Sequence, residues 1–260
     1  MKDEEKIYVL SVAGSDSSAG AGVQADLKTI MALGGYCVVS ITSITAQNKN
    51  KVSKIYTLDS SLVIEQIKTV LQDFNIKGIK IGLITNHNLS KKISAYIQGL
   101  NIPIVVDPVF VSTSGFKFIS ENNYKKSQIA LSNCANLLTP NIREAEILSK
   151  IKINNNPKNI EESLLLIYQK MKTPILIKGT HFENDQIVDT LFDGSKFKRF
   201  MHKKIDIEDL HGTGCTLSSA ICFYLAQGLN LEKSIKKARG YILSILKKSS
   251  VLKPKGYLNH

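Results

Sequence analysis

The sequence predicts an α/β fold in which helices cover both faces of a mostly parallel central sheet. The first observation behind this is that short apolar runs alternate with segments of helical periodicity along the 260 residues. Repeated strand–helix alternation needs parallel strands whose helical crossovers lie on the faces of the sheet. The second is that no repeat and no long Gly/Ser/Pro linker divides the chain, so we expect one domain spanning residues 1–260.

Each predicted strand is a short run of apolar and β-branched residues that ends at a glycine, a proline or a polar residue. The last two strands form a hairpin, because an Asp193-Gly194 turn lies between them. The predicted strands are 7–14, 37–45, 78–84, 102–110, 135–138, 174–179, 187–192 and 197–201.

The predicted helices combine apolar residues at helical spacing with start and stop signals. The segment 60–74 begins with two serines that can cap a helix and places Val63, Ile67 and Leu71 on one face. A glycine pair ends the helix before it. The predicted helices are 23–33, 60–74, 89–100, 122–133, 143–150, 159–171, 216–227 and 231–248.

A net charge of +12 first suggests a nucleic-acid partner. Only three of the 34 basic residues are arginine, however, and the chain has no tryptophan. Base readers and phosphate clamps depend on the bidentate guanidinium, so we expect no nucleic-acid partner. The charge instead belongs to a solvated helix face or provides a field that attracts small anionic substrates.

The composition also argues against a membrane partner. No apolar run reaches the ~18 residues that span a bilayer. The acidic start of the chain resembles neither a secretory signal nor a transit peptide. The four cysteines form no CxxC pair and no zinc-spaced cluster, as expected of reduced thiols. We therefore expect a cytoplasmic protein.

The first motif is the loop of small residues at 13–22, between a strand and a helix. Part of it matches GxGxxA, but residues 27–58 contain no acid to bind a ribose, which argues against a dinucleotide site. No P-loop sequence occurs either. The loop is either a tight structural turn or a segment, including Gly14, whose backbone closes over a small ligand.

The second motif is HGTGCTLSSA, residues 211–220, where Gly212 and Gly214 precede a helix. Glycines let backbone N–H groups turn inward, and a helix N-terminus adds unpaired donors and a positive dipole. This predicts an anion hole for a transferring phosphoryl group. Cys215 lies where a helix dipole lowers a thiol pKa, which favours a functional thiol over the alternative of a small buried apolar residue.

The third group consists of polar residues that follow predicted strands. Asp107 ends one strand, while Asn141 and Glu144 follow the next and would share a helix face. Oxygen ligands of this kind suit hydrated magnesium. A capping box between Asn141 and Glu144 is the alternative. Lys178 emerges from an apolar strand at the same edge of the sheet.

These stretches, in this order, resemble the hydroxymethylpyrimidine/phosphomethylpyrimidine kinase branch of the ribokinase-like superfamily. The matching segments lie between residues 13 and 221 and read AGSDSSAGAGVQADLKT, ITAQN, KIGLI, VVDPVFVSTSG, LLTPNIREAEIL, ILIKGTH and HGTGCTLSSAI. The cysteine of GTGC is the sharpest sign, because most of the superfamily has aspartate there.

The resemblance implies a ribokinase-like three-layer sandwich that uses ATP and magnesium and forms a homodimer. The implied reaction phosphorylates 4-amino-5-hydroxymethyl-2-methylpyrimidine and then its monophosphate, to give the diphosphate used to build thiamine.

The resemblance also implies roles for individual residues. The implied substrate-binding residues are Gln47, Asp26, Gly14, Leu83 and Val109. The implied nucleotide-binding residues are Lys178, Asn141 and Thr213, and Asp107 and Glu144 are the implied magnesium ligands. Catalysis falls to Cys215, which would activate the hydroxyl, and to Gly212, Thr213 and Gly214, which would hold the phosphate.

The chain departs from the family pattern at three positions, Ala19, Leu83 and Thr180, where glycine, methionine and a second glycine are usual. These changes concern substrate fit rather than reaction type. Two alternatives stay open: a pyridoxal kinase on the same fold, and a non-catalytic pyrimidine-binding regulator. The intact Asp107, Glu144 and HGTGC argue against the regulator, because a protein that had lost catalysis would first lose its phosphate-binding residues.

Overall fold

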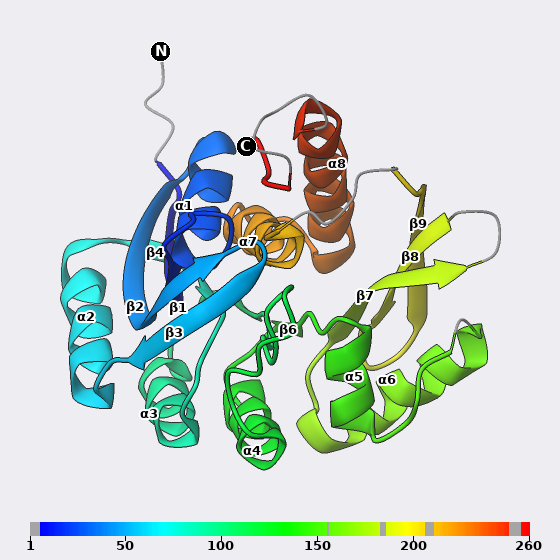
Figure 1. Ribbon diagram of the computed structural model, residues 1–260, viewed down its shortest axis with the longest axis horizontal. Coiled ribbons are helices and arrows are strands. Elements are labelled where there is room, and N and C mark those ends of the chain that lie inside the picture. The colour runs from blue at the N-terminus through cyan, green and yellow to red at the C-terminus, as the bar shows by residue number, and fades with distance from the viewer. Residues whose placement is uncertain (1–5, 155, 183–185, 206–210, 250–255) are drawn as a thin grey trace.

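The central element of the computed structural model is a nine-stranded sheet (Figure 1). The structure describes residues 6–154, 156–182, 186–205, 211–249 and 256–260. The strand order is β3-β2-β1-β4-β5-β6-β7-β8-β9. The strands are β1 (Tyr8–Asp16), β2 (Tyr36–Asn48), β3 (Lys51–Thr57), β4 (Ile76–Ile81), β5 (Ile104–Val106), β6 (Leu137–Leu138), β7 (Ile175–Phe182), β8 (Gln186–Phe192) and β9 (Phe197–Lys203).

Strands β2, β1, β4, β5, β6 and β7 pair in parallel, whereas β3 at one edge and β8 and β9 at the other pair antiparallel. The predicted mostly parallel sheet is therefore confirmed. Parallel strands bring their carboxyl ends to one edge of the sheet, where ligands bind in folds of this class.

Helices cover both faces of the sheet, which confirms the three-layer sandwich (Figure 1). Five helices pack into a core cluster on one face, and α1, α7 and α8 pack into a second cluster on the other. The helices are α1 (Gly22–Ala32), α2 (Ser60–Asp73), α3 (His87–Ile97), α4 (Glu121–Ser132), α5 (Ile142–Ser149), α6 (Pro157–Met171), α7 (Thr213–Ala226) and α8 (Leu231–Ser249).

Strand β1 shows how the sheet separates the two clusters. Leu10 and Val12 join the first cluster, while Val9 joins the second, because successive side chains of a strand point to opposite faces. Ser11 shares the face of Val9 and lies directly opposite Lys80 of β4. Two polar residues therefore point toward α1 and α7, and their partners there form part of the site.

Two differences from the sequence prediction have physical causes. Strand β3 was not predicted, because as an edge strand it buries only Val52 and so has no apolar run. Helix α7 begins at Thr213 rather than at residue 216, which places Cys215 inside the first turn. Within the described residues, no helix has the length and apolar character needed to cross a membrane.

Candidate active site

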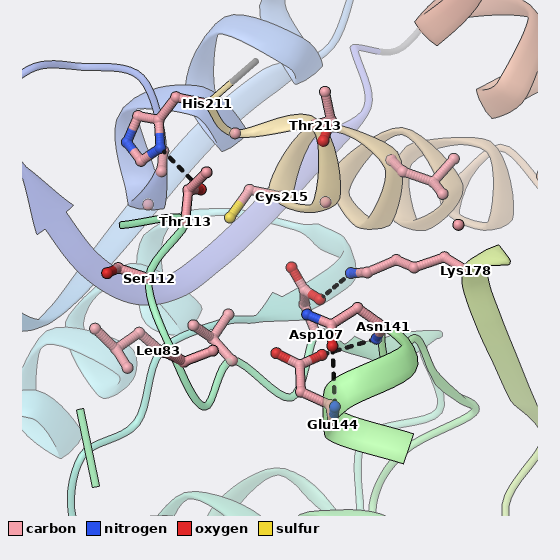
Figure 2. Close-up of a pocket in the computed structure, with 18 of the residues that line it drawn as sticks. Leu83, Asp107, Ser112, Thr113, Asn141, Glu144, Lys178, His211, Thr213 and Cys215 are labelled. Atoms are coloured by element: carbon pink, nitrogen blue, oxygen red, sulfur yellow. Dashed lines mark hydrogen bonds and ion pairs between the residues drawn. The ribbon is translucent and has the colours of Figure 1, made fainter. Parts of the chain in front are cut away.

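A cavity of about 670 Å³ opens at the carboxyl ends of the parallel strands (Figure 2). It lies between the loops that follow β1, β4, β5 and β6 on one side and the start of α7 on the other. All but one of the predicted site residues line it. They are Gly14, Gln47, Leu83, Asp107, Val109, Asn141, Glu144, Lys178, Gly212, Thr213, Gly214 and Cys215.

Asp26 is the exception, and its predicted place in the substrate pocket is wrong. Its side chain has no exposed surface, and both carboxylate oxygens bind Lys80 Nζ, at 2.7 and 2.8 Å. The hydroxyls of Ser11 and Ser219 also donate to it, at 2.6 and 2.7 Å. Asp26 therefore lies behind Lys80, which itself lines the cavity. The sequence could not show this pair, because its members are 54 residues apart.

Lys178 and Asp107 form the polar centre of the cavity (Figure 2). Lys178 Nζ lies 2.5 Å from Asp107 Oδ1, and Thr139 donates to the same oxygen at 3.3 Å. Burial alone would raise the pKa of Asp107, but the charges of Lys178 and Lys80 hold it below its ordinary value. Asp107 is therefore an ionised carboxylate paired with an ammonium group at the cavity wall.

Asn141 and Glu144 form a capping box, which was the alternative to a magnesium site in the sequence analysis. Asn141 Oδ1 accepts the Glu144 N–H at 2.9 Å, and Glu144 Oε2 accepts the Asn141 N–H at 2.8 Å. Glu144 Oε1 also accepts the N–H of Phe110 at 3.2 Å. The cap holds the Glu144 carboxylate in a fixed orientation while it lines the cavity beside Asp107.

The donor set fits a hydrated magnesium ion. Burial raises the pKa of Glu144 to about 7, opposed by the charge of Lys178 and reinforced by that of Asp107. The two carboxylates therefore repel each other and would gain from a cation. No group of three or more His, Cys, Asp or Glu side chains placed to hold a metal ion occurs among the residues that the structure describes. Water and phosphate oxygens would complete the octahedron that magnesium prefers.

The start of α7 brings backbone N–H groups to the opposite wall of the cavity. Gly212 has a φ of +88°, and a Cβ there would lie 1.8 Å from the Gly20 carbonyl oxygen, so only glycine fits. A Cβ at Gly214 would lie 3.0 Å from Lys178 Nζ, so the helix start and the ammonium group approach each other closely. This combination of a cation and unpaired helix donors suits a phosphate group.

The expectation of a lowered thiol pKa at Cys215 is wrong for the free protein. Burial raises the pKa of Cys215 to about 11. The positive charge of Lys80 lowers this pKa, and the negative charges of Asp107 and Asp26 raise it. Loss of water around the sulfur is the largest contribution to this shift of the Cys215 pKa. Cys215 nevertheless lines the cavity beside Thr113 and Thr213 (Figure 2).

The loop after β1 is organised by Asp16. Its carboxylate accepts the N–H groups of Ser18, Gly20 and Ala21 and the hydroxyl of Ser18, at 2.9–3.2 Å. Ala19, where the family usually has glycine, has a φ of +57°. A non-glycine residue in this left-handed region costs about 1–2 kcal/mol, so the hydrogen bonds of Asp16 hold a strained loop.

Several residues that line the cavity were not predicted from the sequence. Asp16 and His211 lie inside the two glycine-rich motifs, and Lys80 is a charged residue in an apolar strand. Their places in the glycine-rich motifs and in the apolar strand were the features of the sequence that could have indicated them.

At the α8 end of the cavity, Arg239 forms an ion pair with Asp189 and lies 2.5 Å from His202 Nδ1. Asp189 Oδ1 accepts the N–H of Gly179 at 2.8 Å, next to Lys178. Arg239 is one of only three arginines in the chain, which was a signal in itself. These contacts fix the backbone of β7 where Lys178 enters the cavity.

Known proteins give a consistent picture. A hydroxymethylpyrimidine/phosphomethylpyrimidine kinase from Aquifex aeolicus is 37% identical over 254 residues, which cover 96% of this chain and 98% of that protein. A crystal structure of phosphomethylpyrimidine kinase from Clostridium difficile 630 has a TM-score of 0.80 at 35% identity, and the match covers 93% of this chain and 100% of that one.

The pyridoxal kinase of Staphylococcus aureus in complex with AMP-PCP has a TM-score of 0.86 at 29% identity, with 98% of this chain and 93% of that one covered. The sequence model of the phosphomethylpyrimidine kinase family matches residues 16–258. The chain therefore belongs to the phosphomethylpyrimidine kinase family.

Proposed function

We propose that this chain transfers the γ-phosphoryl group of ATP to the hydroxymethyl group of 4-amino-5-hydroxymethyl-2-methylpyrimidine, and then to the phosphate of the monophosphate formed. The product would serve thiamine synthesis. One observation carries the proposal: a single cavity is lined both by Gln47, whose amide can bind a polar ring, and by Lys178 and the start of α7, which suit a phosphate group. Kinase relatives at 35–37% identity support the same reaction.

The residues divide the work between holding charge and placing the substrate. Phosphoryl transfer depends mainly on positioning and on stabilising charge at the phosphoryl oxygens. Lys178 and the N–H groups of residues 212–214 would bind those oxygens, and Thr213 would add a hydroxyl. Gln47, Gly14, Leu83 and Val109 would hold the ring, in keeping with their place on the cavity wall.

Asp107 and Glu144 would hold a hydrated magnesium ion, with Asn141 near the phosphates. The ion would supply positive charge that neutralises the phosphates. Cys215 would take the proton of the attacking hydroxyl. With a pKa of about 11, the thiol is protonated in the free protein at neutral pH, so this role requires a minor thiolate population. Proton transfer to Cys215 would therefore occur only in the small fraction of enzyme molecules with an ionised thiol, or late in the phosphoryl transfer.

Both phosphorylations would use this one cavity, because it brings the glycine-flanked start of α7 together with Lys178 and Asp107. The test is an ATP assay with the hydroxymethylpyrimidine, its monophosphate and pyridoxal as acceptors. We expect kcat/KM to be largest for the two pyrimidines, and Gly214→Ala to reduce both activities together. Loss of one activity alone would contradict a shared site.

Pyridoxal kinase activity is the second candidate, because solved pyridoxal kinases share this fold at TM-scores up to 0.88. Their identities of 26–30% lie below those of the pyrimidine kinases, which favours the pyrimidine. A larger kcat/KM for pyridoxal would reverse the order. The homodimer, the cytoplasmic location and the single domain of residues 1–260 stay predictions, and sedimentation velocity tests the first.

A further inference from the structure

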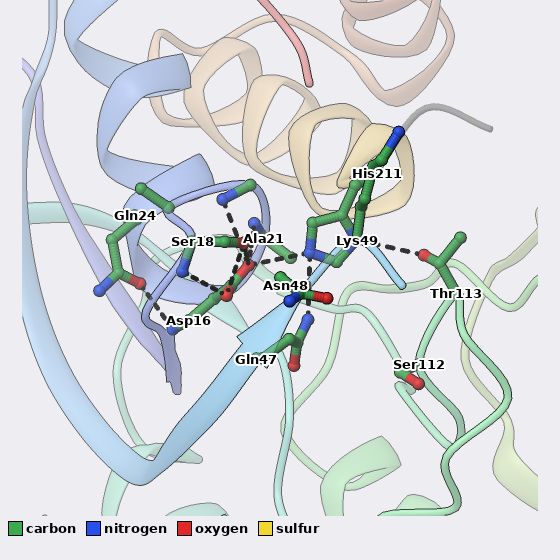
Figure 3. A network of polar contacts seen from close by, with 12 residues as sticks. Asp16, Ser18, Ala21, Gln24, Gln47, Asn48, Lys49, Ser112, Thr113 and His211 are labelled. Carbon is green, nitrogen blue, oxygen red and sulfur yellow. Dashed lines mark hydrogen bonds and ion pairs between the residues drawn. The ribbon is translucent and has the colours of Figure 1, made fainter. Parts of the chain in front are cut away.

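His211 contacts three segments that surround the substrate end of the cavity (Figure 3). Its Nε2 lies 2.8 Å from Oδ2 of Asp16, the last residue of β1, and 3.0 Å from the amide nitrogen of Gln47 at the end of β2. Its Nδ1 lies 3.3 Å from Thr113 Oγ1 in the loop after β5. His211 also directly precedes Gly212, so one ring joins the substrate end to the phosphate end.

The proton on His211 can be assigned from its partners. Asp16 accepts hydrogen bonds from three backbone N–H groups and from Ser18, so it acts only as an acceptor. Burial alone would raise the pKa of Asp16, but hydrogen bonds from His211 and Ser18 hold it below its ordinary value. A carboxylate 2.8 Å from Nε2 requires a proton on that nitrogen.

That proton settles the orientation of the Gln47 amide. An NH2 group facing a ring N–H forms no hydrogen bond, because both groups are donors. A half-turn of the terminal amide keeps the shape of the side chain and exchanges its oxygen for its nitrogen. With the oxygen toward His211, the Nε2–H is shared between Asp16 and Gln47, and no donor in the network faces another donor.

We propose that His211 is a positioning residue that turns the Gln47 amide so that its oxygen faces the imidazole and its NH2 faces the substrate. The proposal rests on the proposed function and defines its ring recognition more closely. Gln47 then offers the substrate a hydrogen-bond donor, which pairs with a ring nitrogen rather than with the exocyclic amine.

The packing around His211 holds the ring in this arrangement. The residue is only 3% exposed, and a Cβ at Gly20 would lie 2.3 Å from its Cδ2, so the loop backbone lies directly against the imidazole. The edge of Tyr257 closes another side, with 6.2 Å between ring centroids. A ring fixed on these sides and anchored by Asp16 has no room to turn over and exchange its nitrogens.

The test measures kcat/KM of the parent enzyme and two variants on four substrates. The substrates are the hydroxymethylpyrimidine, the analogue without the exocyclic amine, and the two analogues in which one ring nitrogen is replaced by CH. The parent should lose at least tenfold on one ring-nitrogen analogue and less than threefold on the analogue without the amine. The reverse order would overturn the proposal, because it would show that Gln47 presents its oxygen to the amine.

His211→Gln and His211→Asn form a matched pair. The glutamine amide nitrogen occupies nearly the position of Nε2 and can still donate to Asp16 and Gln47, whereas asparagine is too short to reach them. We expect His211→Gln to keep the preference for the ring nitrogen and His211→Asn to reduce it below threefold. An unchanged preference in His211→Asn would leave Gln47 independent of His211 and would overturn the proposal.

Two further measurements separate this proposal from the proposed reaction and from misfolding. Calorimetric titration with the same four compounds gives the ring preference without turnover. A preference for the ring nitrogen in binding, together with absent phosphorylation, would overturn the reaction and leave the role of His211 intact. Nitrogen-15 NMR of the parent at pH 8 should show a protonated Nε2 on His211, and a bare Nε2 would overturn the proposal whatever the variants do.

Discussion

Two lysine–aspartate pairs lie near the cavity, one behind its wall and one facing it, and they differ in what surrounds them. Lys80 and Asp26 have no exposed side-chain surface, whereas Lys178 is 12% and Asp107 3% exposed toward the cavity. The sealed pair has a fixed set of partners, and the open pair meets the space where a phosphate and a metal would bind. The same two residue types therefore support the fold in one place and face the ligand in the other.

Helix α7 contributes to both pairs through consecutive serines. Ser219 donates to Asp26 at 2.7 Å, and Ser218 lies 3.3 Å from Asp107. The short contact belongs to the sealed pair, where Ser11 also donates to the Asp26 carboxylate, at 2.6 Å. The longer contact is the weaker hydrogen bond of the two, and Asp107 is held mainly by Lys178. Cys215 lies one turn earlier, and its pKa is shifted by the charges of Lys80, Asp26 and Asp107.

Breaking the sealed pair should have the largest effect on stability. Lys80→Met leaves the Asp26 carboxylate buried without its cation, which should lower the free energy of unfolding by about 3–5 kcal/mol in urea titrations. The double variant Lys80→Met/Asp26→Leu removes both charges and should recover part of the loss. A loss below about 1 kcal/mol for Lys80→Met would show that Asp26 does not depend on Lys80.

Breaking the open pair should mainly affect the reaction. Lys178→Met removes a cation from the phosphate end and should lower kcat by about 10²- to 10³-fold, as loss of a group that stabilises transition-state charge does. The loss of unfolding free energy should be less than half that of Lys80→Met, because water in the cavity can solvate Asp107. Activity within tenfold of the parent, with equal destabilisation, would mean that the two pairs do not differ in role.

The smallest expected effect is a pH dependence at Cys215, between the two pairs. A thiol with a pKa of about 11 is ionised in about one molecule in ten thousand at pH 7. If the thiolate is the base, single-turnover rates of the parent should rise about tenfold per pH unit from pH 7 to 9. Cys215→Asp, ionised throughout that range, should remove the slope and keep activity.

Cys215→Ser keeps the shape of the side chain without an accessible anion and should lose much of kcat while still binding substrate. A flat pH profile for the parent, with Cys215→Ala within a few-fold of its rate, would instead assign Cys215 to packing alone. The loss of kcat in Lys178→Met would then have to be explained by charge stabilisation alone, without a protein group that takes the proton.

The sequence predicted the layers and the location of the site because both depend on local patterns. Alternation of apolar strands and amphipathic helices predicts the parallel sheet, and parallel strands present their ends at one edge. Residues directly after strands, such as Asp107 and Asn141, therefore lie at the cavity. The edge strand β3 was missed because its single buried residue leaves no such pattern.

Only the tertiary structure decided which charges face each other. Asp26 and Lys80 are 54 residues apart, and Asp16 and His211 are 195 apart, so no local signal connects them. Their pairing follows from the order of the strands and from the packing of α1 and α7 on one face of the sheet. The pKa of Cys215 was decided in the same way: the sequence shows a thiol at a helix start, but the surrounding atoms determine how much water reaches it, and desolvation raised its pKa.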